Sequence, residues 1–196
     1  MALTDEKLKK NGLGSPSSSS SFFNPSSVKE GDEVRFTILG DDFSTGFELW
    51  LDGPEKGMKT RFTDEPSQAE MESRAKELGG KLRGDANPRQ FLAYAIWNYE
   101  TEKVQVFEFS QQSIANPLIA ALSDEEVEAE PSLTDFKISA TGSGLEKRYQ
   151  VVTLPGRRRK PNLDAPISEA WDKAVKAGFD ISVLVSGCDP FTGKPF

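Results

Sequence analysis

Residues 90–109 read QFLAYAIWNYETEKVQVFEF, and their pattern decides the kind of fold. The half from Gln90 to Tyr99 is almost wholly apolar and aromatic, as in a strand buried by the rest of the protein. After a short connection, Lys103 to Phe109 alternates valines with Gln105 and aromatic residues, which predicts a second strand. Together they predict a hairpin of two central strands.

Alternating apolar residues also predict strands before this hairpin. Glu33–Leu39 and Phe47–Asp52 have the period of two residues that half-buried strands show, and the polar, glycine-bounded segment Gly40–Gly46 is interpreted as a turn between them. In the second strand Trp50 lies on the face opposite to its leucine neighbours. The sequence therefore places one tryptophan away from the aliphatic core.

A short strand and a surface helix are expected next. Met58–Phe62 predicts a strand that carries Lys59 and Arg61. Ser67–Leu78 predicts a charged helix, because Ser67 and Glu70 have the spacing of a capping box. This helix is expected at the surface.

The region after the hairpin predicts one helix and two strands. Ser110 is expected to cap a helix that ends near Leu122, and Asp135–Ala140 and Lys147–Thr153 are expected to be strands joined by the glycine turn Thr141–Gly144. Strands, a helix and a last pair of strands are the order of an OB-type barrel. We therefore expect a mainly β protein with a few helices: an OB-like five-stranded barrel with an extra hairpin, an inserted helix and flexible termini.

Composition divides the chain into three parts. Residues 1–27, with serines from Ser17 to Ser21, are expected to form a flexible arm. Residues 28–160 are expected to form the OB-like nucleic-acid-binding domain. Residues 161–196 are expected to hold a C-terminal helix, from Ser168 to about Ala177, and an interaction tail.

The composition excludes several kinds of site. The 196 residues contain no histidine, which removes histidine bases and histidine metal ligands, and a single cysteine, Cys188, which removes disulfides within the chain and cysteine zinc clusters. The net charge of −7 argues against a protein coated in basic charge, although a basic groove on an acidic body is compatible with it. With no signal-peptide core and no apolar run of membrane length, we expect a soluble, cytoplasmic protein.

Carboxylate clusters are the only catalytic candidates. Asp41–Asp42, Asp64–Glu65 and Asp124–Glu126 lie in expected loops, where acidic residues usually serve solvation. Two carboxylates can hold magnesium when water and phosphate complete its shell, so a metal-dependent enzyme stays open as a third alternative. We expect no enzyme, no metal and no cofactor.

Aromatic and basic residues predict a binding surface for single-stranded nucleic acid, which is held by base stacking and by cations along the phosphates. Residues 146–160 contain six basic residues and one acidic residue, whereas residues 123–135 contain six acidic residues and no basic ones. Strand aromatics such as Tyr94 and Trp97 are also ordinary core residues, and a basic run is usually a solvated loop. The candidate nucleic-acid-binding residues are Trp50, Lys59, Arg61, Tyr94, Trp97, Arg148, Tyr149, Arg157, Arg158, Arg159 and Lys160.

An ordered series of segments from Phe91 to Thr153 resembles phage-encoded single-stranded DNA-binding proteins of the OB-fold type. The segments are Ala95–Tyr99, Val104–Phe109, Gln112–Ile114, Asp135–Ile138, Gly142–Leu145 and Tyr149–Val151, followed near the end by Gly187–Phe191. Many of those proteins carry Trp-Gly before the strand at Asp135, where this chain has Glu128–Pro131. The tail is less acidic than those of bacterial single-strand binders but shares their final Pro-Phe.

The resemblance implies a non-enzymatic protein that coats single-stranded DNA in phage replication or recombination, in the host cytoplasm. It also implies that the tail recruits replication or recombination proteins through Asp189, Pro190, Phe191, Pro195 and Phe196. The alternative is a protein-interaction adaptor, virion or regulatory, that binds no nucleic acid. Salt-dependent binding of an oligonucleotide distinguishes the two.

Overall fold

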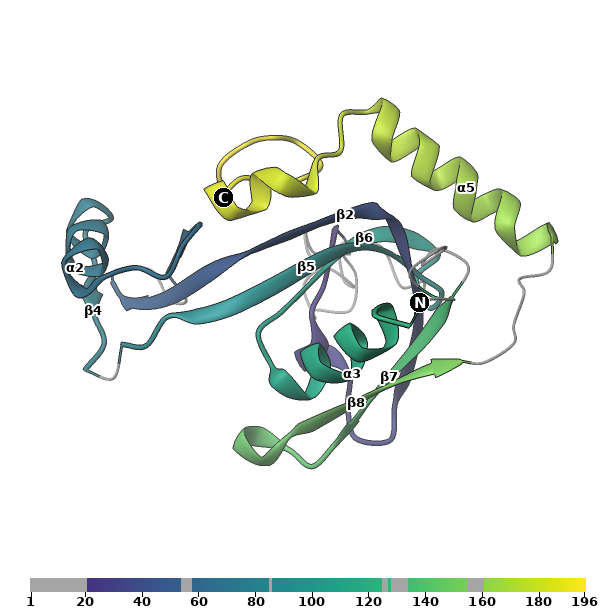
Figure 1. Cartoon of the computed structure of the whole chain (residues 1–196), viewed down its shortest axis with the longest axis horizontal. Coiled ribbons are helices and arrows are strands. Elements are labelled where there is room, and N and C mark those ends of the chain that lie inside the picture. Colours follow the sequence, from purple (N-terminus) through teal and green to yellow (C-terminus); the bar gives the residue numbers. More distant parts are fainter. Residues whose placement is uncertain (1–20, 54–57, 85, 125–126, 128–133, 155–160) are drawn as a thin grey trace, which may run out of the picture.

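The computed structural model describes residues 21–53, 58–84, 86–124, 127, 134–154 and 161–196. This part of the chain is mainly β with a few helices, as expected (Figure 1). The helices are α2 (Gln68–Glu77), α3 (Gln112–Leu122) and α5 (Pro161–Lys176), with 3₁₀ segments η2 (Pro25–Ser27), η4 (Gly144–Glu146) and η5 (Ile181–Ser186). The strands are β1 (Phe22–Phe23), β2 (Glu33–Asp52), β3 (Lys59–Phe62), β4 (Lys81–Leu82), β5 (Arg89–Asn98), β6 (Lys103–Phe109), β7 (Asp135–Thr141) and β8 (Arg148–Leu154).

The strands form one open mixed sheet in the order β1-β6-β5-β2-β7-β8, and β3 and β4 pair with the far end of β2. The pairs are antiparallel except for β1 with β6. The outer edge of β6 pairs with β1, and β8 pairs with β7. An OB-like barrel is therefore not confirmed, because the sheet formed by the described strands is not closed.

β2 is one strand of 20 residues, so the turn expected at Gly40–Gly46 is wrong. The segment from Phe43 to Glu48 pairs with β5, and a register shift between Ile38 and Phe43 bends the strand without reversing it. Gly40 lies in this bend with φ of +67°, and an added Cβ would come within 2.9 Å of the Trp171 ring. Bends of this kind need glycine, because other residues are strained at positive φ.

Several local predictions are confirmed. β5 and β6 form the expected hairpin, and β7 and β8 lie where strands were expected. Helix α2 begins after Ser67, whose side chain accepts from the Glu70 backbone N–H while the Glu70 carboxylate accepts from the Ser67 backbone N–H. The Ser67 hydroxyl also donates to the Glu70 carboxylate, and this bond together with the one from the Ser67 backbone N–H holds the pKa of Glu70 below its ordinary value.

Two helix starts were predicted wrongly. The N-cap of α3 is Gln111, and the Ser110 hydroxyl, expected as the cap, donates to Glu48 Oε1 at 3.0 Å. α5 begins at Pro161 and not at Ser168. Proline is well tolerated as the first residue of a helix, since the N–H that it lacks would have no partner there.

The main core lies between α3 and the face of the sheet that we call the inner face. Phe36, Ile96 and Phe107 on this face are fully buried and pack with Ile114 and Leu118 of α3. Burial of apolar side chains is the main source of stability in a domain of this size. Phe23 of β1 belongs to the same core, so the end of the expected flexible arm, from Phe22 to Ser27, is folded.

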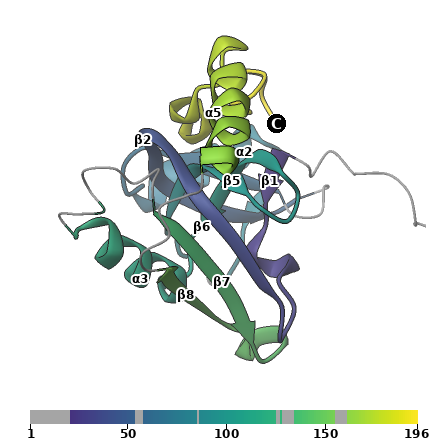
Figure 2. The same ribbon diagram turned by 90° about the vertical axis from the view of Figure 1, so that its right-hand side faces the viewer.

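The opposite face of the sheet, the outer face, is covered by the C-terminal segment. Figures 1 and 2 show α5 and η5 on the side of β2, β5 and β6 that lies away from α3. Phe91 and Val106 pack there against Ile181 and Leu184, and a second cluster holds Trp97 against α5. The C-terminal helix is therefore part of the same packed body.

The far end of β2, with β3, α2 and β4, forms a lobe that we call the α2 lobe (Figure 1). Its small core joins Leu49 and Leu51 to Met71 and Ala75 of α2. Residues 1–20 and the expected basic loop 157–160 lie outside the described residues. Among the helices that are described, none combines the length and the hydropathy needed to cross a bilayer.

Candidate nucleic-acid interface

Trp50 stands on the outer face of β2, as its alternation with Leu49 and Leu51 predicted. Both leucines are buried, whereas 39% of the Trp50 surface is exposed. The antiparallel register of β2 and β3 sets Lys59 directly opposite Trp50, and Lys59 Nζ lies 5.7 Å from the centre of the indole ring. A cation over an aromatic ring is attracted to it, and single-stranded nucleic acid is held by aromatic rings that stack bases and by cations along the phosphates.

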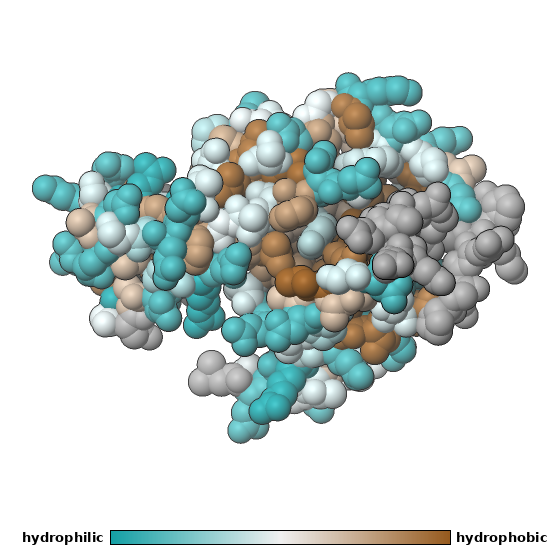
Figure 3. Space-filling model, viewed as in Figure 1, coloured by the Kyte–Doolittle hydropathy of each residue, from teal (hydrophilic) through white to brown (hydrophobic). Residues whose placement is uncertain are grey.

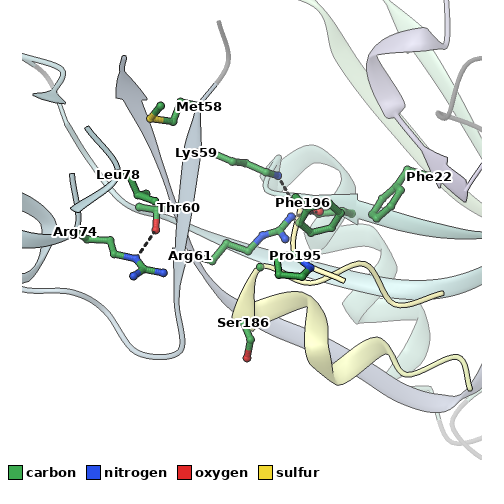
Figure 4. A pocket seen from close by; sticks show the side chains of 12 residues that line it. Phe22, Met58, Lys59, Thr60, Arg61, Arg74, Leu78, Ser186, Pro195 and Phe196 are labelled. Atoms are coloured by element: carbon green, nitrogen blue, oxygen red, sulfur yellow. Dashed lines mark hydrogen bonds and ion pairs between the residues drawn. The ribbon is translucent and has the colours of Figure 1, made fainter. Parts of the chain in front are cut away.

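Three hollows that share lining residues, two of them lined by Trp50, make up the surface that we call the outer groove. The first hollow, the β3 cavity, has a volume of about 640 Å³ and lies between β3, α2 and the C-terminal residues (Figure 4). It shares Phe22, Lys59 and Glu108 with the second hollow, and the second shares Trp50 with the third. The cations of the outer groove are Lys59, Arg61, Arg74, Arg83 and Arg89, and its carboxylates are Glu48 and Glu108.

One face of the molecule is mixed in character. Figure 3 shows hydrophobic atoms reaching the surface over the middle of the molecule, while the α2 lobe is mostly hydrophilic.

A buried ion cluster forms the floor of the groove. Glu108 of β6 accepts from Lys59 Nζ and from Arg61 Nη2, each at 2.6 Å, and Lys59 also reaches Glu48 at 3.3 Å. The Arg61 side chain is only 4% exposed, donates to the Leu184 carbonyl at 2.9 Å, and lies over the rings of Phe91 and Phe196. Arg61 is thus mainly a structural cation, and Lys59 is the more accessible of the two.

The charge cluster changes the acidity of Glu108. Burial by itself raises the pKa of this carboxyl group, but the charges and hydrogen bonds of Lys59 and Arg61 outweigh burial and bring the pKa below its ordinary value of 4.5. The group therefore stabilises the folded protein above the pKa that it has in the unfolded chain. That contribution is lost as the pH falls through the lower pKa of the folded state.

Acidification should reveal this contribution in the melting temperature. We expect the difference in Tm between the wild type and Glu108→Gln to stay constant above about pH 5.5. It should shrink as the pH falls below about 4.5, where the carboxyl group of the unfolded chain binds its proton, and stop shrinking only below the lower pKa of the folded state. Calorimetry of both proteins from pH 7 to pH 3 measures it. A difference that keeps its size down to pH 3 would contradict the assignment.

The structure brings together only part of the predicted nucleic-acid-binding set. Trp50, Lys59 and Arg61 share the outer groove. Trp97 is 8% exposed, in the cluster beneath α5, and Tyr94 is on the inner face, with its ring between Phe43 at 5.7 Å and Phe109 at 6.4 Å. The outer groove therefore contains neither Tyr94 nor Trp97.

The other predicted residues lie elsewhere in the chain. Arg148 and Tyr149 are on β8, whose partner β7 pairs with the first residues of β2, at the opposite end of that strand from Trp50. Lys147 lies over the Tyr149 ring at 5.4 Å and donates to the Ser26 carbonyl, and burial raises the pKa values of Tyr94 and Tyr149. Arg157, Arg158, Arg159 and Lys160 lie outside the described residues.

The predicted partner-binding tail packs on the body of the protein. Asp189 Oδ1 accepts from the Phe191 backbone N–H, Pro190 is buried, and the Phe191 ring packs edge-on against Phe179 at 4.9 Å. Pro195 and Phe196 line the β3 cavity. Phe196 is 68% exposed.

Sequence reasoning missed Arg74, Arg83 and Arg89. Arg89 pairs with Glu48 in the β2–β5 ladder. A turn at Gly40–Gly46 does not predict this pairing, because it ends the first strand before Glu48. Arg83 donates to Asp52 at 3.0 Å across the end of β2. Because β2 is one long strand, residues 81–84 and 86–89 lie beside Trp50.

Within the described ranges, no three aspartate, glutamate or cysteine side chains gather in a way that holds a metal ion. No protein-family model matches the chain. Neither a curated protein nor a solved structure matches it.

Proposed function

We propose that the protein binds single-stranded DNA with little sequence preference, without enzymatic activity of its own, and acts in phage DNA replication or recombination. The observation that carries the proposal is Trp50, an exposed indole in the middle of a groove lined by cations. The phage setting and the host cytoplasm rest on the resemblance of residues 91–153 to phage-encoded proteins. Recruitment of other proteins through Pro195 and Phe196 is part of the same proposal.

The chemistry of the groove favours a single strand over a duplex. A base can stack on the Trp50 ring only when it is unpaired and turned out of a helix. Lys59, Arg83 and Arg89 line the two hollows that Trp50 also lines, and they offer charge to the flanking phosphates. Stacking and phosphate contacts read no base edges, so little sequence preference is expected.

The order of the elements supports an OB-like plan for this function. β2, β5 and β6 form a three-strand meander, α3 follows, and β7 returns to pair with β2. OB folds bind oligonucleotides on the face of their second and third strands and on nearby loops. In an OB-like plan the binding face includes β5 and β6. The outer groove extends this face to the part of the sheet where the far end of β2 pairs with β5.

Replacing Trp50 by alanine should weaken binding of oligo-dT by roughly five- to 150-fold, because each stacked base contributes about 1–3 kcal/mol. Trp50→Phe should keep most of the affinity, since it retains an aromatic face. The matched control is Phe43→Ala, which removes an aromatic side chain that is 52% exposed on the inner face. Fluorescence titration with a labelled oligo-dT, with circular dichroism to check folding, measures all four proteins.

The salt dependence of oligonucleotide binding distinguishes a single-stranded DNA-binding protein from an adaptor that binds only protein. If three cations contact phosphates, the logarithm of the binding constant should fall with the logarithm of salt concentration with a slope of about −2. A duplex of the same length should bind more weakly. If the wild type binds no oligo-dT at low salt, the proposal is wrong and an adaptor that binds only protein is favoured.

A further inference from the structure

The β3 cavity has the size and the lining of a ligand site. Its volume of about 640 Å³ falls within the range of small-molecule pockets. Figure 4 shows it between β3 and Leu78 on one side and Phe196, Pro195 and Ser186 on the other. Two separate parts of the fold, the α2 lobe and the C-terminal segment, therefore form its walls.

One part of the lining is apolar. Met58 and Leu78 line the cavity on the side of the α2 lobe. Phe196 and Phe22 line it on the other side and contact each other with ring centres 5.8 Å apart. Leu78 and Phe196 are both among the exposed large apolar side chains, at 39% and 68%. Exposed apolar side chains that line a hollow mark a site for an apolar group of a ligand.

The other part of the lining carries positive charge. Lys59, Arg61 and Arg74 line the cavity with one carboxylate, Glu108, which leaves an excess of two positive charges. The buried Arg61 Nε–H has no hydrogen-bond partner among the described residues, although an unpaired buried donor is costly. Arg74 donates to Thr60 and forms an exposed pair with Glu77, a contact of little energy that a phosphate can replace.

We infer that the β3 cavity binds one nucleotide of the bound strand. The base packs against the apolar part of the lining, which includes Leu78 and Phe196, and the phosphate is neutralised by Arg74 and Lys59. A nucleotide joins a flat apolar ring to an anion, which is the combination that the lining offers. This inference rests on the proposed function and goes beyond stacking on Trp50, because it adds a second subsite for a base.

The position of the cavity fits a continuous strand. Lys59 lies beside Trp50 and also lines the cavity, so it stands between the two places where a base is held. Neighbouring bases can then stack on Trp50 and enter the β3 cavity, with the phosphate between them near Lys59.

The test combines affinity with a map of contacts. Arg74→Gln should weaken oligo-dT binding and reduce the salt slope by about 0.7, the value for one phosphate contact on a single strand. Lys76→Gln makes the same charge change on the same helix and should leave the slope unchanged, because Lys76 does not line the cavity. Leu78→Trp fills the cavity from a partly exposed position and should also weaken binding.

Photocrosslinking then places the base. Oligo-dT that contains 5-iodouracil should crosslink to peptides that contain Met58 or Phe196, and Leu78→Trp should remove these crosslinks while a crosslink to the Trp50 peptide remains. Crosslinks at Trp50 alone, with Arg74→Gln equal to Lys76→Gln, would overturn the nucleotide subsite and leave the proposed function intact. Absence of wild-type binding would overturn both.

Discussion

Glu108→Gln should lower the free energy of unfolding by about 3–5 kcal/mol, the usual cost of breaking a buried ion pair by removing one partner. The substitution keeps the shape of the side chain and removes its charge. Arg61, with a side chain only 4% exposed, is then left as a buried cation without its carboxylate, and Lys59 keeps only Glu48. Urea unfolding of the wild type and the variant measures the loss.

A compensated variant shows whether the charge is the cause. Replacing both partners, Glu108→Leu with Arg61→Met, should recover most of the lost stability, because apolar residues of similar volume often substitute for a buried ion pair without loss. Equal instability of the single and double variants would mean that packing, and not the unpaired charge, causes the loss. The single variant should bind oligo-dT at least as tightly as the wild type, since it removes a carboxylate from the outer groove.

Phe107→Ala should cost a comparable amount, about 3–5 kcal/mol, through the cavity that it leaves in the main core. Phe107 is fully buried, and its ring lies within 4.8–5.2 Å of the rings of Phe23, Phe36 and Phe109. Because β1 contributes Phe23, the loss should also loosen the pairing of β1 with β6. Chemical denaturation followed by circular dichroism measures the change.

The matched control for this core substitution is Phe43→Ala. It removes the same side chain from a position that is 52% exposed, so its cost should stay below about 1 kcal/mol. Hydrogen exchange of the Phe22 and Phe23 backbone amides should rise in Phe107→Ala and not in the control. A small loss of stability at Phe107 would contradict the description of the main core.

The sequence predicted those parts of the fold in which a local pattern determines the structure. The β5–β6 hairpin and the capped helix α2 follow from residues that are close in the chain, and both are confirmed. The turn expected at Gly40–Gly46 was wrong because this polar segment owes its strand structure to pairing with β5, nearly fifty residues later. Pairing with a distant strand does not change the local composition, so the composition of Gly40–Gly46 could not predict it.

The candidate site shows the same division. Alternation around Trp50 was enough to place its side chain outside the aliphatic face. Trp97 has an equally aromatic neighbourhood, but it is covered by α5, which comes about seventy residues later. Arg74 and Arg89 reach the outer groove only through the long β2 strand and the position of α2, so neither was found from sequence.

The pairing of β2 with β7 has a consequence for the folding rate. Arg35 and Asp135 form an ion pair across these strands although 100 residues separate them in the chain. The chain loses the entropy of closing a long loop before such a distant contact stabilises it. Chains rich in distant contacts therefore fold in milliseconds to seconds. In stopped-flow refolding, the β5–β6 hairpin is therefore expected to gain protection before the β2–β7 ladder does.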